Sequence, residues 1–444
     1  MTPAMRKTVI IGGGLSGLAA ARDLALAGQQ VTLLESAPVA GGLASSLRLK
    51  GESVEHFYHF ICRGDDALVE MVNELGIGAH LRWRHVRTSF FHEGRLYGFG
   101  TPIDLLRFSA VPVMQRLRFG WHVTRSSLRS KWRWLDELPA RAWLIENIGE
   151  EAYNVIWHPL LRVKFGEAYD KISAAWVWHR IWRVARSRQG RFGRSVFGYL
   201  THGSDTVVRA LLDWLEAQPN VSVRTGVRVT GVDVREGAVK GVRLEGETIA
   251  CQSVISTVAL PALDRLVPGQ TSDYFERVRQ VQYIGVVCAL FSLRRPFSTS
   301  FWMNINDPRI CFNGVIEQTN LNANLREAGL NLLYVPYYLP TTEPRYRHTN
   351  QQVYDEYVPM LRLVNPQFDE SWIDEVFVAR TAYAQALCTT NFARLRPEHR
   401  TPIRGLYVTD STQFYPEDRT ISAAIAQGRK AAGFCLEDGR GARA

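Results

Sequence analysis

The apolar positions of the chain predict alternating strands and helices from its start. The β-branched run KTVII at 7–11 leads directly into glycines, and LSGLAAARDLALAG at 15–28 has the Ala and Leu content of a helix that ends at a glycine. A second apolar run, QVTLL at 30–34, follows this helix. Strand, tight turn, helix and strand in this order predict an α/β fold.

Two long segments interrupt this α/β pattern. The first, 90–197, predicts helices and is dense in Trp and Arg. The second, 268–397, predicts strands at YIGVVCALFSL (283–293) and NLLYVPYYL (331–339), and a helix near NQQVYDEYVPMLRLV (350–364). We therefore expect a helical cap and a substrate-binding domain with a mixed sheet.

The first turn carries a glycine pattern that predicts dinucleotide binding. Gly12, Gly14 and Gly17 fall in the G-x-G-x-x-G register: the first permits the turn, the second lets backbone N–H groups approach a pyrophosphate, and the third lets helix and strand pack closely. Glu35 ends the second strand, about 20 residues further on, where its carboxylate is placed to accept hydrogen bonds from ribose hydroxyls. The complete order of strand, glycines, helix, strand and acid favours dinucleotide binding over the alternative, a glycine-rich turn that binds no ligand.

The residues after Glu35 indicate which dinucleotide is bound. SAPVAGGLASS places Gly41 and Gly42 where an NAD-binding fold would normally proceed to its next helix. At this point the sequence resembles the FAD-containing amine oxidase superfamily, which includes protoporphyrinogen oxidase and the phytoene desaturases. The resemblance implies that FAD is the cofactor and that the N-terminal segment binds it through Gly12, Gly14, Leu15, Ser16, Gly17, Glu35, Ser36, Gly41, Gly42 and Leu43.

Further stretches resemble the same superfamily in the expected order. GYLTHGSDTVVRALL, from Gly198, is similar to the return into the FAD domain, and Val229 resembles the residue whose backbone faces the adenine. In the C-terminal stretch GLYVTDSTQFYPEDRTISAAIAQG, the resemblance implies that Asp410 reaches the ribityl and pyrophosphate, with Arg419 also at the cofactor. A helix beginning near Thr420 would direct its N-terminal amides at the flavin. The superfamily usually has glycine where this chain has Thr409.

The expected architecture follows from these segments. A Rossmann-like FAD-binding domain of the glutathione reductase type is assembled from residues 1–89, 198–267 and 398–444. A helical cap or membrane-facing insertion covers 90–197, and a substrate-binding domain with a mixed sheet covers 268–397. Large apolar pockets at such domain junctions are the default ligand site.

The net charge and the cysteines limit which partners and which cellular location are expected. The formal net charge is +10, and much of the excess lies between 107 and 194, where Arg and Lys alternate with Leu, Phe and Trp. This pattern fits either core-packed helices with solvated arginines or peripheral contact with an anionic membrane surface. No nucleic-acid-binding module accompanies the charge. The six scattered cysteines and the absence of a signal-peptide segment favour the cytoplasm, with peripheral attachment to the inner face of the membrane left open, and no metal site is expected.

Candidate chemistry lies near the two interrupting segments. The stretch VEHFYHFICRGDD is similar to a segment of UDP-galactopyranose mutases, and this likeness implies that His59 approaches the flavin to stabilise charge or relay a proton; a structural histidine is the alternative. Glu317 is a candidate general base, because a carboxylate beside an apolar pocket can have a raised pKa. The alternative is that Glu317 lies in a surface turn. The remaining candidates for substrate contact are Arg162, Lys164, Asn320 and Tyr334.

The leading functional hypothesis is an FAD-dependent oxidoreductase. Hydride would pass from a small-molecule or lipid-like, prenyl-type substrate to flavin N5. Only one glycine fingerprint is present, which favours reduction of the flavin by the organic substrate and reoxidation by oxygen, a quinone or another acceptor. Binding of NAD(P)H directly at the flavin is the alternative. A non-redox sugar-nucleotide mutase and a flavin-binding protein without turnover are the alternatives. Substrate, acceptor and oligomeric state do not follow from the sequence.

Overall fold

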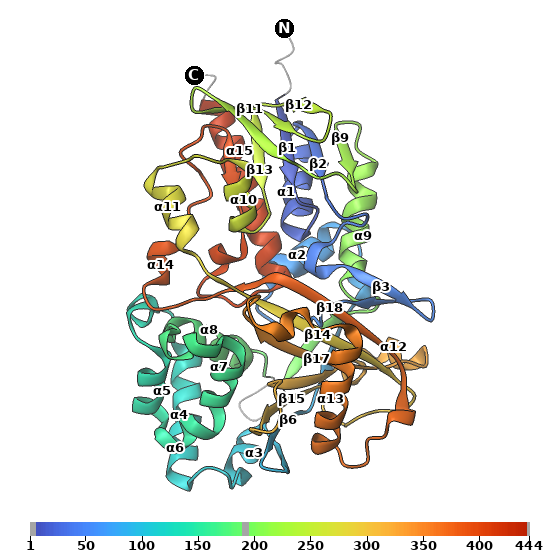
Figure 1. Cartoon of the computed structure of the whole chain (residues 1–444), viewed down its shortest axis with the longest axis vertical. Coiled ribbons are helices and arrows are strands. Elements are labelled where there is room, and N and C mark those ends of the chain that lie inside the picture. Colours follow the sequence, from blue (N-terminus) through green and yellow to red (C-terminus); the bar gives the residue numbers. More distant parts are fainter. Residues whose placement is uncertain (1–5, 189–194, 442–444) are drawn as a thin grey trace.

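The computed structural model describes residues 6–188 and 195–441. Its architecture is mixed α/β, as the sequence predicts. In Figure 1 a parallel sheet with its helices occupies the upper part, a larger sheet lies below it, and a group of helices lies beside that sheet at the lower left. The start of β1 and the end of α15 lie at the top of this view, beside the parallel sheet.

Five parallel strands form the upper sheet, in the order β19-β13-β1-β2-β9. Neighbouring strands come from distant parts of the sequence, and their inner residues are almost entirely buried, as in parallel sheets covered on both faces. The strands are β1 (Lys7–Ile11), β2 (Gln30–Leu34), β9 (Val221–Arg224), β13 (Ser253–Ser256) and β19 (Leu406–Val408).

Helices pack closely around this sheet. Gly428 of α15 lies so near α1 that a Cβ there would stand 2.1 Å from the backbone oxygen of Ser16. The close approach brings the start of α1 and the start of α15 to one end of the sheet. The helices of this part are α1 (Leu15–Leu26), α2 (Asp66–Glu74), α9 (Asp205–Glu216), α10 (Leu260–Leu266), α11 (Asp273–Gln280), α14 (Phe392–Leu395) and α15 (Ile421–Gly441).

Three smaller sheets accompany the two main ones. An antiparallel three-stranded sheet consists of β10 (Gly231–Arg235), β11 (Ala238–Arg243) and β12 (Thr248–Ala250). Two-stranded pairs are formed by β3 (Ser46–Leu49) with β4 (Glu52–Glu55), and by β5 (Leu81–His85) with β8 (Val196–Leu200).

The larger sheet has seven strands, in the order β18-β14-β17-β16-β15-β6-β7. The sheet is mixed, because β15 pairs with β6 in parallel while its other pairs are antiparallel. Helix α13 packs over it through a shared apolar cluster. Its elements are β6 (Thr88–His92), β7 (Arg95–Gly98), β14 (Tyr283–Leu293), β15 (Trp302–Asn306), β16 (Gly314–Glu317), α12 (Ala323–Glu327), β17 (Asn331–Leu339), α13 (Asn350–Val364) and β18 (Ile373–Ala386).

The helical layer lies mostly within the segment that the sequence predicts to be helical. Its amphipathic helices bury their Trp, Leu and Ile residues against one another. The helices are α3 (Pro102–Arg107), α4 (Val113–Leu128), α5 (Ala140–Ile148), α6 (Glu150–Ala152), α7 (His158–Phe165) and α8 (Ala174–Arg186), with a π turn at Tyr153–Trp157.

Element limits agree with the sequence where the apolar pattern is long. Strands β14 and β17 and helix α13 coincide with the predicted segments. The start of 90–197 differs, because β6 and β7 form a hairpin in the seven-stranded sheet before the first helix. All six cysteines are free thiols, and the described residues contain no group of His, Cys, Asp or Glu that could hold a metal ion. Within the same residues, no helix is both long enough and apolar enough to cross a bilayer.

Candidate active site

A cavity of about 570 Å³ lies where the parallel sheet, the seven-stranded sheet and the helical layer meet. This volume is typical of small-molecule and cofactor sites. One end is lined by the glycine turn and the start of α15. The other end is lined mostly by apolar side chains of the helical layer, which are Phe119, Val123, Ile156, Trp157, Leu160 and Ile181.

The glycine turn has the geometry that its spacing predicts. Gly12 has φ +109°, which favours glycine, and a Cβ there would stand 2.4 Å from Thr257 Oγ1. Gly14 precedes α1 and lines the cavity with Leu15 and Ser16. Gly17 lies outside the cavity; a Cβ at this position would stand 2.0 Å from the backbone oxygen of Gly12, so its role is close packing of the helix on the turn.

Glu35 and the second glycine pair lie beside this turn. The Glu35 carboxylate lines the cavity and accepts hydrogen bonds from the N–H groups of Gly13 and Ala37, both at 2.7 Å. Gly41 and Gly42 have φ of +121° and +57° and line the cavity with Leu43. Ser36 is exposed and lies outside the cavity.

The C-terminal segment supplies the facing wall. Asp410 is buried, and its Oδ1 accepts hydrogen bonds from the Tyr283 hydroxyl and the Thr412 N–H, both at 2.8 Å. Thr420 caps α15 by accepting a hydrogen bond from the Ala423 N–H at 2.9 Å. Arg419, which donates to the Ala384 carbonyl, lines the cavity together with Asp410 and Thr420.

Val229, whose contact with the adenine stays a prediction, lies outside the cavity lining. It is half-buried in the loop between β9 and β10. In the same loop the N–H of Val227 donates to the backbone oxygen of Glu35 at 2.8 Å, which ties the loop to the end of β2. The structure thus places Val229 near the expected end of the sheet without bringing it into the cavity.

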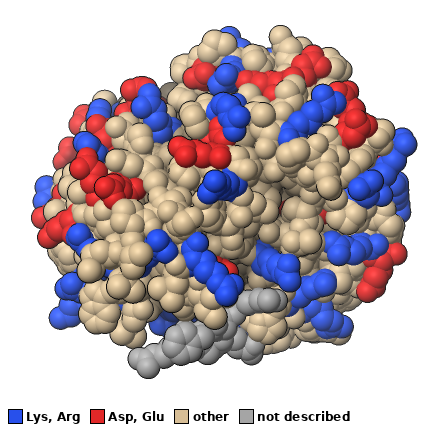
Figure 2. Space-filling view, turned by 90° about the horizontal axis from the view of Figure 1, so that it is seen from below, with Lys and Arg blue, Asp and Glu red and all other residues tan. Residues whose placement is uncertain are grey.

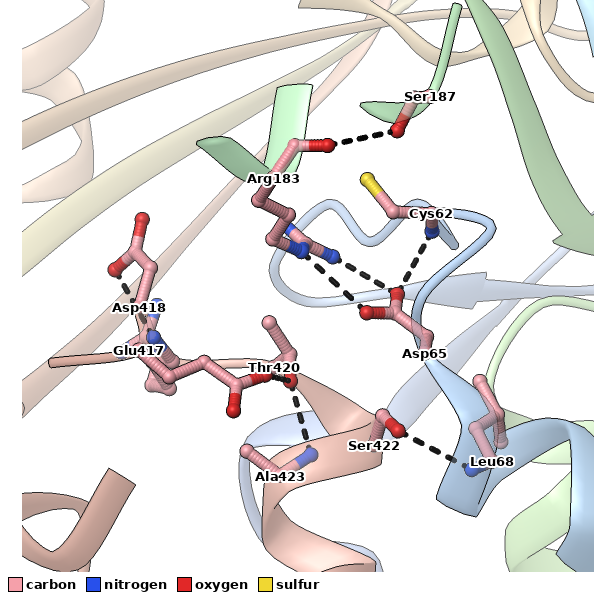
Figure 3. Close-up of polar contacts among 11 residues, drawn as sticks. Cys62, Asp65, Leu68, Arg183, Ser187, Glu417, Asp418, Thr420, Ser422 and Ala423 are labelled. Carbon is pink, nitrogen blue, oxygen red and sulfur yellow. Dashed lines mark hydrogen bonds and ion pairs between the residues drawn. The ribbon is translucent and has the colours of Figure 1, made fainter. Parts of the chain in front are cut away.

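A charge network links the helical layer to the segments that precede α2 and α15. Arg180 Nη1 lies 2.9 Å from Asp418 Oδ2. One turn further along α8, Arg183 Nη2 donates to Asp65 Oδ2 at 2.9 Å, and the Cys62 N–H donates to the same oxygen at 2.7 Å. Figure 3 shows the Arg183 guanidinium pointing at Asp65, with Asp418 on the loop before α15.

Four residues are predicted to contact the substrate, and of these four Lys164 lines the cavity. Its Nζ lies 4.8 Å from the ring centroids of both Trp176 and Tyr338, and its side chain is buried. Burial lowers the pKa of Lys164 to about 7, against the attraction of Asp418. Burial opposes ionisation of Asp418, but Lys164, Arg180 and Arg183 outweigh it and hold the pKa of Asp418 well below its usual range.

His59 also lines the cavity, as the sequence predicts. Its Nδ1 lies 3.4 Å from Glu55 Oε1, and its backbone oxygen accepts a hydrogen bond from the Gln318 side chain at 3.0 Å. The neighbouring Tyr58 ring meets the Trp302 ring edge-on at 5.3 Å, and both rings line the cavity. His59 thus belongs to the cavity lining, with its Nδ1 beside the Glu55 carboxylate.

The structure corrects the prediction that Glu317 is a general base. Glu317 ends β16 outside the cavity, and its carboxylate accepts hydrogen bonds from the Phe297 N–H, the Ser298 N–H and the Ser298 hydroxyl at 3.0, 2.7 and 2.9 Å. Burial raises the pKa of Glu317 to about 7, although these hydrogen bonds oppose the shift. The carboxylate therefore fixes a loop and has no access to a substrate.

Three of the predicted substrate contacts also lie outside the cavity. The Asn320 amide donates to the backbone oxygens of Ser298 and Ser300, so it supports the same loop as Glu317. Tyr334 is buried, and its hydroxyl donates to the backbone oxygen of Glu55 at 2.7 Å. Arg162 is exposed on α7, because it lies two positions from Lys164 and thus on another face of the helix.

Sequence reasoning missed several polar residues of the cavity. Arg180 and Arg183 lie one turn apart on α8, and Asp418 directly precedes the predicted Arg419. The signal for the arginines was their three-residue spacing in WHRIWRVAR, which puts both on one helix face. The signal for Asp418 was its place in PEDRT, just before the helix that the sequence predicts.

Comparisons with known proteins agree with this geometry. Residues 15–436 match the family described as flavin containing amine oxidoreductase. The chain therefore belongs to this family: it is an FAD-dependent oxidoreductase. A flavin-dependent L-tryptophan oxidase from Lentzea aerocolonigenes is 23% identical over 333 residues, which are 67% of this chain and 67% of that protein.

Solved structures show the same fold. Reduced UDP-galactopyranose mutase has a TM-score of 0.76 at 17% identity, covering 98% of this chain and 96% of that chain. Cyclohexylamine oxidase from Brevibacterium oxydans has a TM-score of 0.73 at 15% identity, covering 98% and 99%. At these identities the likeness is one of fold.

The cavity residues fit FAD. The start of α1 has no side-chain cap, so the N–H groups of its first turn, where Leu15 and Ser16 line the cavity, are free to bind a pyrophosphate. Opposite them, Thr409 Oγ1 is buried and has no hydrogen-bond partner among the described residues. A dinucleotide along this wall would use both sets of groups.

Proposed function

We propose that the protein oxidises an organic substrate with a largely apolar, lipid-like body. The observation that carries this proposal is the continuity of the cavity: the end that fits FAD opens into a chamber walled by apolar side chains of the helical layer. When bound, FAD supplies the hydride acceptor, and oxygen, a quinone or another carrier takes the electrons afterwards. Glycines 12, 14, 41 and 42, Glu35, Asp410 and Thr420 would hold it.

Lys164 is the group that we assign to proton transfer. Oxidation of a C–H bond next to nitrogen or oxygen releases a hydride and, from the N–H or O–H group, a proton. Since burial lowers the pKa of Lys164 to about 7, its Nζ is neutral often enough near neutral pH to accept that proton. Asp418 then lies close enough to stabilise the ammonium that forms.

Aromatic side chains would orient the substrate. Tyr58, Trp302 and Tyr338 come from the loop after β4 and from the seven-stranded sheet, and all three line the cavity beside Lys164 or His59. Aromatic rings of this kind exclude water and restrict the orientations that a substrate can take. His59 offers a second polar contact on this wall.

The first test is an absorption spectrum of the purified protein, followed by acid release of the cofactor. We expect a flavin spectrum and free FAD. Anaerobic mixing with panels of amines, alcohols and prenyl lipids then identifies a substrate as a compound that bleaches the flavin absorbance. Isomerisation of a sugar nucleotide, with no net flavin reduction by any of these panels, would contradict the proposal.

A further inference from the structure

The outer surface of α3 and α4 carries apolar side chains that no other part of the described chain covers. We call it the α3–α4 face and define it by six residues, each more than half exposed: Ile103, Leu106, Met114, Leu117, Trp121 and Leu128. Single exposed apolar residues are common on proteins, but six of them on two helices that contact each other indicate an interaction site.

Helix α4 is apolar on two sides. On its inner side Phe119 is buried and lines the cavity together with Val123, and on its outer side Leu117, Trp121 and Leu128 are exposed. A helix that packs only on its own core has one apolar stripe and a polar outer face. The outer apolar residues of α4 therefore require a partner.

Positive charge accompanies the exposed apolar residues. Residues 102–134 contain seven Arg or Lys and a single acid, Asp104, which is occupied in a capping box with Thr101. The exposed cations of this stretch are Arg107, Arg118, Arg125, Lys131 and Arg133. Figure 2 views the molecule from this end, and in its lower half Lys and Arg stand out while Asp and Glu are sparse.

We propose that the α3–α4 face docks on the surface of a lipid bilayer that contains anionic headgroups. Interleaved Arg and apolar residues suit the headgroup boundary, where cations meet phosphates while Leu, Met and Trp enter the acyl region. A surface with five exposed cations and a single acid repels a second copy of itself, whereas anionic headgroups complement its charge. Docking in the plane of the bilayer also needs no helix that crosses it.

The position of α4 links this surface to the cavity. The same helix that presents Trp121 outward presents Phe119 and Val123 to the apolar end of the cavity. A docked molecule would thus hold the substrate chamber one helix away from the bilayer. Docking itself does not depend on the proposed reaction, so it is tested separately by binding.

The test is co-sedimentation of the full-length holoprotein with vesicles. One set contains phosphatidylcholine alone and the other contains phosphatidylcholine with phosphatidylglycerol. We expect binding to the anionic vesicles that is at least about tenfold stronger than to the neutral ones and that weakens with added salt, because several cations act together. Equal binding to both sets, or no binding to either, would overturn the proposal.

Variants locate the binding surface. Leu117→Ser with Trp121→Ser removes apolar contact, and Arg107→Glu with Arg125→Glu reverses two charges; each pair should weaken binding to anionic vesicles by about tenfold or more. The matched control is Leu26→Ser with Leu363→Ser, which alters exposed apolar residues on α1 and α13. Flavin content and melting temperature of every variant are compared with the unsubstituted protein, so that misfolding is recognised.

Two further outcomes would also overturn the proposal. If the control variant loses vesicle binding as strongly as the Leu117 and Trp121 variant, the α3–α4 face is not the docking surface. If light scattering shows a dimer that Trp121→Ser dissociates, while vesicle binding is unaffected, the face is an interface with a second copy of the chain.

Discussion

Lys164 and Glu317 are both buried ionisable side chains, yet only Lys164 faces the cavity. Three hydrogen-bond donors surround the Glu317 carboxylate, so nothing remains for it to bind. The Lys164 Nζ lies over ring faces and near the Asp418 charge, and it lines the cavity, so it is accessible to a substrate. A perturbed pKa thus indicates a functional site only together with access to a ligand.

We predict that Lys164 loses its proton near pH 7. The chain has seven lysines, so reductive ¹³C-methylation gives few NMR signals, and the signal absent from Lys164→Met should titrate near pH 7. Substrate-dependent flavin reduction should speed up as pH rises through 7, because the neutral amine is the proton acceptor. Lys171→Met, at an exposed position, is the control. Titration of every lysine near pH 10 would refute the assignment.

The same pKa makes a stability prediction with a definite sign. The folded-state pKa of Lys164 is below that of a free lysine, so between about pH 7 and 10 the unfolded chain binds the additional proton. The free energy of unfolding should therefore rise with pH in this window. Chemical denaturation at several pH values in this window gives the slope of the free energy of unfolding against pH. This slope should be smaller for Lys164→Met than for the unsubstituted protein, and equal slopes would contradict the low pKa of Lys164.

Glu317 should matter for stability and not for the cofactor. Glu317→Ala leaves buried donors at Phe297 and Ser298 without an acceptor, which we expect to lower the free energy of unfolding by about 2 to 4 kcal/mol. FAD content should be unchanged. Glu398→Ala, which removes an exposed partner of Arg277, should cost less than about 1 kcal/mol. Loss of FAD from Glu317→Ala at intact fold would show that the carboxylate serves the cofactor.

At the scale of elements, the turn between β1 and α1 depends on a contact that only glycine permits. Gly17→Ala would place a Cβ 2.0 Å from the backbone oxygen of Gly12, so α1 must move away from the turn. We expect this variant to lose most of its FAD, measured as the ratio of flavin to protein absorbance. Gly28→Ala is the control. Alanine at this position is strained, because φ is +75°, but its Cβ would contact no other atom, so the variant should retain FAD. Equal FAD content in both variants would refute this account.

Elements could be predicted where a local pattern encodes them, and the site could be predicted only where it is built from such patterns. The glycine turn, Glu35 and the start of α15 follow from spacing within short stretches. Glu317, Asn320 and Tyr334 were misjudged because the side of a strand or loop that meets the cavity depends on neighbours far away in sequence. The β6–β7 hairpin was missed because its short strands join a sheet whose other five strands all come from 283–386.

At the scale of the whole molecule, two ion pairs of α8 connect the layers around the cavity. Arg180 joins the helical layer to Asp418 in the C-terminal segment, and Arg183 joins it to Asp65 at the start of α2. Apolar contacts fill the remaining surface between the layers. The shape of the cavity therefore depends on α8 being held by charge on both the N-terminal and C-terminal segments.

Arg183 tests this connection. Arg183→Leu leaves Asp65 buried and without its cation, so we expect a loss of about 3 to 5 kcal/mol in the free energy of unfolding, measured by denaturant titration. Arg209→Leu breaks an exposed pair with Asp205 and should cost less than about 1 kcal/mol.

The double variant Arg183→Leu with Asp65→Leu should recover part of the loss, because no buried charge is then left alone. Recovery would assign the loss to the unpaired carboxylate. A double variant as unstable as the sum of its single variants would instead mean that the two side chains stabilise the layers independently, through packing. In that case α8 would be held in place by its apolar neighbours, and the charge network would serve only the ligand.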